Sequence, residues 1–130
     1  MRLFIVRHAE AALGQPDDLR PLTDAGREQA RLLGKQFADD GIHPDAVLSS
    51  PLLRARETAA EIAKAVGVKV EPDERLAPGA DTDDVRAGAS GRGETVVVVG
   101  HQPDCGQIAA AISGDAAPAF PAAGVCELRL

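Results

Sequence analysis

Three short polar clusters hold the residues that could do chemistry. They are Arg7-His8-Ala9-Glu10, residues 49–56, and Gly100-His101-Gln102-Pro103, and they bring two imidazoles together with the guanidinium groups of Arg7 and Arg54. Arginine offers a planar fork of N–H donors that matches phosphoryl oxygens in pairs. A neutral imidazole has a free nitrogen lone pair that can attack phosphorus without a metal ion. The residue types therefore indicate phosphoryl chemistry.

Each cluster directly follows an apolar run that predicts a buried strand. The runs are residues 3–6, 45–48 and 95–99, the last of which contains four consecutive valines. Continuous apolar runs are typical of parallel strands covered on both faces, so we expect the first strand to be central. Since ligands bind at the carboxyl ends of parallel strands, the three clusters should meet at one edge of the sheet.

Helices and further strands are predicted between these runs. Thr23 can cap a helix that reaches about residue 40, and Ser50 and Pro51 read as the N-cap and first residue of a helix that ends near residue 66. A third strand is expected at 68–71, followed by a loop over 72–84 that leads into a weak helix and by a surface connection at 88–93. A helix is expected over 104–113, and an edge strand over 126–130 that can pair in antiparallel orientation. The alternation predicts one α/β domain, residues 1–130, as a three-layer sandwich with a mostly parallel central sheet and helices on both faces.

The bulk composition narrows the classes of partner. Fourteen basic and twenty acidic residues give a formal charge of −6, and the chain has three Phe but no Tyr or Trp. Such a chain repels nucleic acid and anionic membranes and has few stacking platforms for bases, so neither partner is expected. Cys105 and Cys126 lack metal-type spacing and are expected to be small buried residues in a reducing compartment. The first apolar run is too short for a signal peptide, so a cytoplasmic location is predicted.

Several motifs resemble the histidine phosphatase superfamily, which is phosphoglycerate mutase-like in fold. They are Arg7-His8-Ala9-Glu10, Ser49-Ser50-Pro51, Arg54-Ala55-Arg56-Glu57-Thr58 and Gly100-His101. The short length, Arg20-Pro21-Leu22-Thr23 and Leu76-Ala77-Pro78-Gly79 are similar to the small SixA-type phosphohistidine phosphatase branch.

The resemblance implies a metal-independent phosphatase with no cofactor. His8 would be the nucleophile and become transiently phosphorylated, while Arg7, Arg54 and His101 would bind the three non-bridging oxygens. Nearby arginines should keep His8 neutral, and His101, if protonated, would add positive charge. The expected substrate is a phosphohistidine on another protein or a small phosphate ester.

The general acid for the leaving group is the least marked part of the site. Glu74, just before Leu76-Ala77-Pro78-Gly79, is the candidate, with Glu10, Asp81 and Asp83 as further candidates; Arg75 is the alternative occupant of that position. A histidine that leaves as neutral imidazole needs less protonation than an alkoxide, so a poorly marked acid favours phosphohistidine as substrate.

Three other functions compete with this interpretation. The chain could be a general small-molecule phosphomonoesterase with the same core, a non-catalytic phosphate-binding interaction module, or a metal hydrolase that uses His8, Glu10 and His101. His43, Arg56 and Glu57 are expected to be exposed surface residues, the first in a loop and the other two on a helix.

Overall fold

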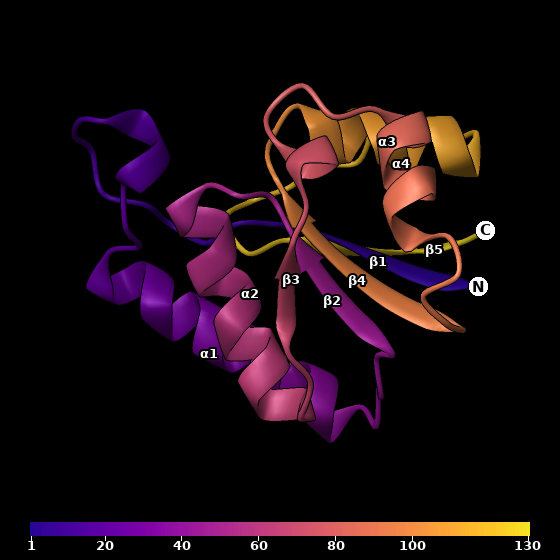
Figure 1. Ribbon diagram of the computed structural model, residues 1–130, viewed down its shortest axis with the longest axis horizontal. Coiled ribbons are helices and arrows are strands. Elements are labelled where there is room, and N and C mark those ends of the chain that lie inside the picture. The colour runs from indigo at the N-terminus through magenta and orange to yellow at the C-terminus, as the bar shows by residue number, and fades with distance from the viewer.

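Five strands form one sheet in the computed structural model, which describes all 130 residues (Figure 1). The strands are β1 (Arg2–Arg7), β2 (Ala46–Ser49), β3 (Val70–Pro72), β4 (Thr95–Gly100) and β5 (Val125–Arg129). Their order is β3-β2-β4-β1-β5; every neighbouring pair is parallel except β1 and β5, which are antiparallel. The predicted mostly parallel sheet and its antiparallel edge strand are confirmed. β1 is an interior strand, but β4 and not β1 occupies the middle of the sheet.

Helices cover both faces of this sheet. They are α1 (Asp24–Asp39), α2 (Leu53–Val66), α3 (Thr82–Ala89) and α4 (Asp104–Ser113), with short 3-10 turns η1 (Asp17–Leu19) and η2 (Glu74–Leu76). Figure 1 shows α1 and α2 on one face and α3 and α4 on the other. The predicted three-layer α/β sandwich is therefore confirmed.

The central strands supply both apolar cores because successive side chains of a strand point to opposite faces. From β1, Phe4 and Val6 pack on the side of α1 and α2, whereas Leu3 and Ile5 pack on the side of α3 and α4. All four are nearly inaccessible to solvent. Burial of each such side chain stabilises the fold by roughly 1.5–3 kcal/mol, so β1 and the segment that follows it are firmly anchored.

Some boundaries differ from the predictions. Thr23 caps α1 as expected, but α2 begins at Leu53 instead of Pro51, with Leu52 at its N-cap. The Ser50 hydroxyl accepts from the Leu52 backbone N–H and contacts His101. β3 lies at Val70–Pro72, later than the expected 68–71. α3 extends to Ala89 and buries Gly88, so the predicted surface connection starts later.

The cysteines and the chain ends complete the description. Cys105 is buried as expected, whereas Cys126 is only half-buried, and both are free thiols. The Leu130 backbone N–H donates to the Met1 carbonyl, which extends the pairing of β5 with β1 to the last residue. None of the helices has both the length and the apolar character that a membrane crossing requires.

Candidate active site

Strand register brings the three polar clusters together. Arg7 pairs with Gly100 at the ends of β1 and β4, so the next residue of each strand, His8 and His101, lie side by side with ring centroids 5.2 Å apart. Ser49 at the end of β2 pairs with Val99, which brings the start of α2 to the same edge. The predicted meeting of the clusters is thus confirmed.

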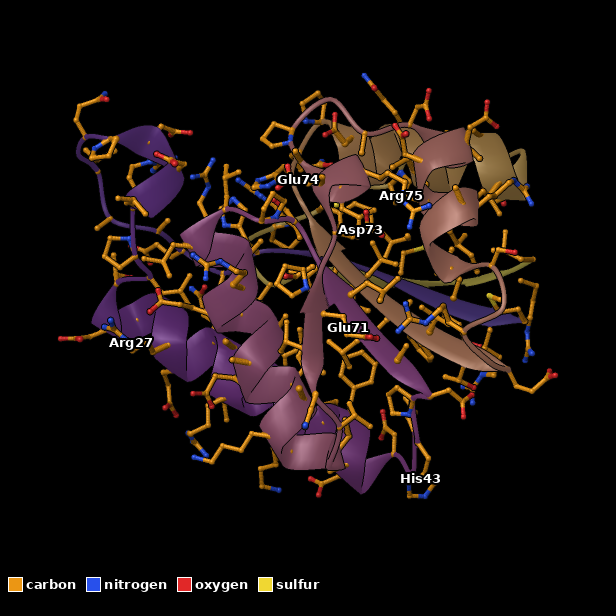
Figure 2. All side chains as sticks on the ribbon, in the orientation of Figure 1. Arg27, His43, Glu71, Asp73, Glu74 and Arg75 are labelled. Carbon is orange, nitrogen blue, oxygen red and sulfur yellow. The ribbon has the colours of Figure 1, made fainter.

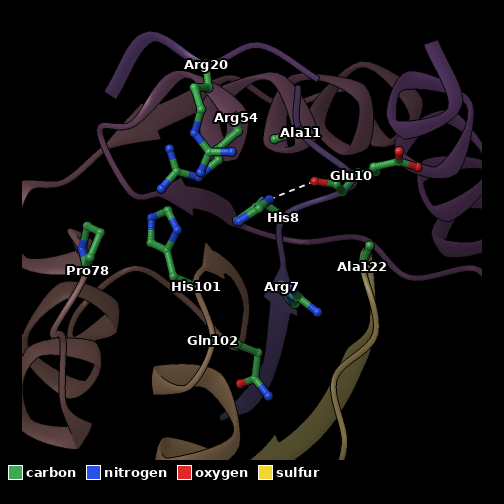
Figure 3. A pocket seen from close by; sticks show the side chains of 11 residues that line it. Arg7, His8, Glu10, Ala11, Arg20, Arg54, Pro78, His101, Gln102 and Ala122 are labelled. Atoms are coloured by element: carbon green, nitrogen blue, oxygen red, sulfur yellow. Dashed lines mark hydrogen bonds between the residues drawn. The ribbon is translucent and has the colours of Figure 1, made fainter. Parts of the chain in front are cut away.

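A cavity of about 400 Å³ opens at this edge (Figure 3). Its lining residues are Arg7, His8, Ala9, Glu10, Ala11, Arg20, Arg54, Pro78, His101, Gln102 and Ala122. The lining contains Arg7, His8, Arg54 and His101, which sequence analysis selected, together with a third arginine, Arg20. A local concentration of guanidinium groups can bind an anion even though the whole chain carries a formal charge of −6.

The His8 backbone and ring are both fixed by hydrogen bonds. Its backbone N–H donates to the Gly100 carbonyl at 3.0 Å, and its carbonyl accepts from the Ala123 N–H at 3.2 Å. The ring Nδ1 lies 2.7 Å from the Ala9 carbonyl, the contact drawn as a dashed line in Figure 3. A carbonyl oxygen can only accept, so Nδ1 carries the proton and the lone pair of the neutral ring lies on Nε2.

The surroundings of His8 favour its neutral form. Burial lowers the pKa of His8 below its usual value, the hydrogen bond to the Ala9 carbonyl opposes this, and the charges of Arg54, Arg7 and Arg20 lower the pKa further. The prediction that neighbouring arginines keep His8 neutral holds in direction, but burial is the larger cause. Near pH 7 the ring therefore offers an unprotonated nitrogen.

His101 is buried, and its Nε2 lies 2.7 Å from the Ser50 hydroxyl. Burial, followed by the nearby His8 and Arg54, lowers the pKa of His101 to about 4. In the unliganded protein near neutral pH His101 is therefore neutral, so it can contribute a hydrogen bond but not a full positive charge. Ser50, interpreted from the sequence as a helix cap and as part of a family motif, is the residue that orients this ring.

Two arginines of the pocket each retain a buried donor without a partner. The Arg54 Nη1 donates to the Asp17 carbonyl at 2.8 Å and Nη2 to its carboxylate at 3.3 Å, while the Arg7 Nη1 donates to the Phe120 carbonyl at 2.8 Å. The Nε atoms of both arginines are buried and have no hydrogen-bond partner. Buried donors without acceptors are costly, and both side chains also line the cavity.

Arg20 is the pocket residue that sequence analysis did not assign. Its Nε donates to the Asp17 carboxylate at 2.9 Å and its Nη1 to the Ala12 carbonyl at 3.1 Å, which brings it to the pocket from the connection between β1 and α1. The only sequence signal was its place in Arg20-Pro21-Leu22-Thr23, which was used for the resemblance and not for the site.

The candidate acids do not converge on the histidines. Glu74 is exposed on η2 and does not line the pocket (Figure 2), while Asp81 caps α3 and Asp83 is exposed on it. Glu10 is the one carboxylate in the lining, and in Figure 3 its side chain points away from His8 and His101. The catalytic role of Glu74 stays a prediction.

Three residues expected at the surface have different outcomes. His43 is exposed, as predicted, and does not line the pocket (Figure 2). The prediction was wrong for Arg56 and Glu57, which are half-buried. The Arg56 Nε donates to the Pro51 carbonyl, and the Glu57 carboxylate accepts from the Leu22 backbone N–H at 2.8 Å. Both therefore hold the segments that border the site.

Known proteins match the chain in sequence and in structure. The family model for the histidine phosphatase superfamily (branch 1) matches residues 3–78. The phosphohistidine phosphatase SixA of Escherichia coli (strain K12) is 30% identical over 138 residues, which cover 100% of this chain and 86% of that protein. The protein histidine phosphatase SixA complexed with tungstate superposes with a TM-score of 0.90 at 29% identity, covering 100% of this chain and 88% of the other. A structure assigned as SixA from Agrobacterium tumefaciens gives 0.85 at 27% identity, with 97% and 89% covered.

Proposed function

The chain belongs to the histidine phosphatase superfamily, and from this membership we propose that it is a SixA-type phosphatase that hydrolyses phosphohistidine on a partner protein. The observation that carries the proposal is the ring of His8, which keeps its proton on Nδ1 and its lone pair on Nε2 beside three arginines that line one cavity. A neutral nucleophile next to fixed cations is what attack on a phosphoryl group requires.

In the first step, His8 Nε2 attacks phosphorus and the bond from phosphorus to the substrate imidazole breaks. A substrate ring that carries a proton on its other nitrogen leaves as neutral imidazole, and His8 keeps its Nδ1 proton on the Ala9 carbonyl. Arg7, Arg20 and Arg54 stabilise the charge spread over the phosphoryl oxygens. His101 adds a hydrogen bond to these oxygens.

In the second step, water attacks the phosphoryl group on His8. The bond from phosphorus to Nε2 breaks and its electron pair returns to Nε2, while one proton of the water passes to a phosphoryl oxygen, so that dihydrogen phosphate leaves and His8 is again neutral with its proton on Nδ1. The arginines provide the positive charge that a metal ion would otherwise supply, so the reaction needs no metal or other cofactor.

The position of Glu10, the one carboxylate in the pocket lining, supports phosphohistidine over a phosphate ester. An alkoxide leaving group must be protonated as it departs, but no carboxylate of the lining points at the two imidazoles. Neutral imidazole departs without such help. The relatives named SixA act on or are assigned to phosphohistidine, and one of them holds tungstate, a tetrahedral oxyanion similar to phosphate.

The cellular setting is inferred from the cysteines. Both thiols of the chain are free, which fits a reducing compartment. A cytoplasmic location follows as part of the proposal, and fractionation of the producing cells tests it.

The decisive experiment follows phosphate from a protein labelled with 32P on histidine. Wild type should release inorganic phosphate and, after rapid quenching, carry acid-labile label. His8→Ala should carry none, whereas His43→Ala, which removes an exposed histidine instead, should label like wild type. A wild-type protein that never labels would contradict the proposal and favour a phosphate-binding module.

A second comparison separates the two enzymatic functions. The kcat/KM for the phosphohistidine protein is measured against that for sugar phosphates and p-nitrophenyl phosphate. Preference for the protein supports the proposal, and preference for the esters would assign the chain to small-molecule phosphomonoesterases.

A further inference from the structure

Two arginines of the pocket are held by one carboxylate. Asp17, on η1, accepts from the Arg20 Nε through Oδ1 at 2.9 Å and from the Arg54 Nη2 through Oδ2 at 3.3 Å. Its backbone carbonyl accepts from the Arg54 Nη1 at 2.8 Å. The Arg20 and Arg54 guanidinium groups lie next to each other in Figure 3. Each carboxylate oxygen of Asp17 thus serves a different cation.

The electrostatics explain why such a bridge is needed. Two guanidinium groups side by side repel each other, and the Arg54 side chain is only 7% exposed, so water screens its charge poorly. Without a counterion, Arg20, whose side chain is the more exposed of the two at 21%, would be free to turn toward solvent. The Asp17 carboxylate offsets the repulsion and fixes the direction of both donor forks.

The position of Asp17 argues against a direct part in bond breaking. Asp17 does not line the cavity, and its side chain is 61% exposed. The hydrogen bond from Arg20 and the charges of Arg54 and Arg20 lower the pKa of its carboxyl, so it stays ionised at working pH and is a poor proton donor.

We propose that Asp17 is a positioning residue of the phosphatase site, which aligns the guanidinium groups of Arg20 and Arg54 so that their remaining donors meet the phosphoryl oxygens. The proposal rests on the proposed function. It adds Arg20 to the phosphoryl-binding cations and makes η1 part of the catalytic apparatus. The carboxylate also lowers the net positive charge at the pocket edge, which weakens ground-state binding of phosphate.

These two effects of Asp17 predict an unusual kinetic signature for Asp17→Asn. The amide replaces one carboxylate oxygen by an NH2 donor, so one of the two guanidinium groups loses its acceptor, alignment in the transition state is lost and kcat should fall at least tenfold. The site gains net positive charge, so KM for the phosphohistidine protein and Kd for inorganic phosphate should be unchanged or lower. The backbone carbonyl contact with Arg54 remains, so the segment stays attached.

Matched variants make the test specific. Asp18→Asn removes the neighbouring carboxylate, which is exposed and makes no hydrogen bond, and should leave kcat and KM at wild-type values. Asp17→Glu keeps the charge and should restore part of the lost kcat. In a double-mutant cycle, Asp17→Asn should cost clearly less in an Arg20→Gln background, because Asp17 acts through Arg20.

Three results would each overturn the proposal: a wild-type kcat in Asp17→Asn, a raised KM with unchanged kcat in that variant, or additive effects of Asp17→Asn and Arg20→Gln. If Asp17→Asn unfolds at a lower urea concentration, the double-mutant cycle of kcat, measured where all variants are folded, still tests whether Asp17 acts through Arg20. Failure of the proposed function shows separately, as absence of label on His8 in the wild type.

Discussion

The tautomer of His8 is decided by one backbone carbonyl. Because the Ala9 oxygen lies 2.7 Å from Nδ1, the proton is held on the side of the ring that faces the main chain. The Ala9 N–H is in turn held at 3.0 Å by the Thr58 hydroxyl. The reactive nitrogen is therefore set by local backbone geometry and needs no neighbouring base to remove a proton.

The buried imidazole of His101 makes stability depend on pH. Its pKa is about 4 in the folded state, below the ordinary value of about 6.5 that applies when unfolded. Between these values the unfolded chain binds more protons, so stability is present above pH 6.5 and is lost as pH falls toward 4. We expect a loss of about 2 kcal/mol between pH 7 and pH 5 from this residue.

Urea unfolding at several pH values measures this dependence. His101→Gln should flatten the fall in the free energy of unfolding between pH 7 and pH 5. His43→Gln, at an exposed site, should keep the wild-type slope. A His101→Gln variant with an unchanged slope would show that His101 does not account for the effect.

Arg54 and Arg56 form a natural pair for testing the phosphoryl site. They are neighbours on α2, but Arg54 lines the pocket while Arg56 holds the Pro51 carbonyl outside it. Loss of a preorganised charge at a transition state costs roughly a hundredfold in rate. Arg54→Ala should therefore lose at least about that factor in kcat/KM, and Arg56→Ala much less, measured on phosphohistidine protein. Equal losses would refute the assignment of Arg54.

The sequence revealed those site residues that directly follow strands or begin a helix. Arg7, His8 and His101 adjoin apolar runs, so their meeting follows from parallel pairing. The sequence did not predict Arg20 and Asp17 as site residues, because they lie in the long connection from β1 to α1. The path of this connection depends on tertiary contacts such as the Arg54–Asp17 pair. No periodicity encodes such a path.

At the scale of elements, Thr58 joins α2 to the segment after β1. Its fully buried hydroxyl donates to the Arg54 carbonyl at 2.8 Å and accepts from the Ala9 N–H. One side chain thus connects the helix that carries a phosphoryl-binding arginine to the residue whose carbonyl orients His8.

Thr58→Val keeps the shape but removes this acceptor. The buried Ala9 N–H would then lack a partner, which costs about 1–3 kcal/mol. We expect that loss in urea unfolding, together with reduced kcat because Ala9 no longer holds the His8 ring in place. Thr58→Ser retains the hydroxyl and should keep most of the activity. Wild-type stability and kcat in Thr58→Val would contradict the link.

The sequence predicted the boundaries of helices and strands correctly where a single local signal determines them. The cap of α1 by Thr23 is purely local and was predicted correctly. Ser50 is not the N-cap of α2, because Leu52 occupies that position, although the Ser50 hydroxyl still accepts from the Leu52 N–H and contacts His101. β3 was displaced because three residues at a sheet edge are decided by pairing with β2 more than by their own pattern.

At the scale of the whole molecule, the site depends on segments from both halves of the chain. Arg7 and Arg54 precede residue 78, where the family match ends, while His101 and the Phe120 carbonyl that holds Arg7 come after it. The apolar runs predicted this assembly in outline, since they fixed which strand ends meet. The contact with Phe120 could not be foreseen, because it joins residues 113 positions apart through an irregular segment.

Binding of an anion should therefore stabilise the entire fold. Inorganic phosphate would offset the repulsion among the three arginines that line the pocket, Arg7, Arg20 and Arg54. Because only the folded chain assembles this site, phosphate at a hundred times its Kd should raise the free energy of unfolding by about 2.7 kcal/mol.

The control for general salt effects follows from the charge of the molecule. With six more acidic than basic residues, the chain offers little nonspecific attraction to anions, so sodium chloride at equal ionic strength should reproduce only a small part of the increase. Thermal unfolding with phosphate and with chloride measures the difference, and Arg54→Ala should abolish most of it. Equal stabilisation by the two salts would mean that the arginines do not form a phosphate site, because a specific site must distinguish a tetrahedral oxyanion from a monovalent ion.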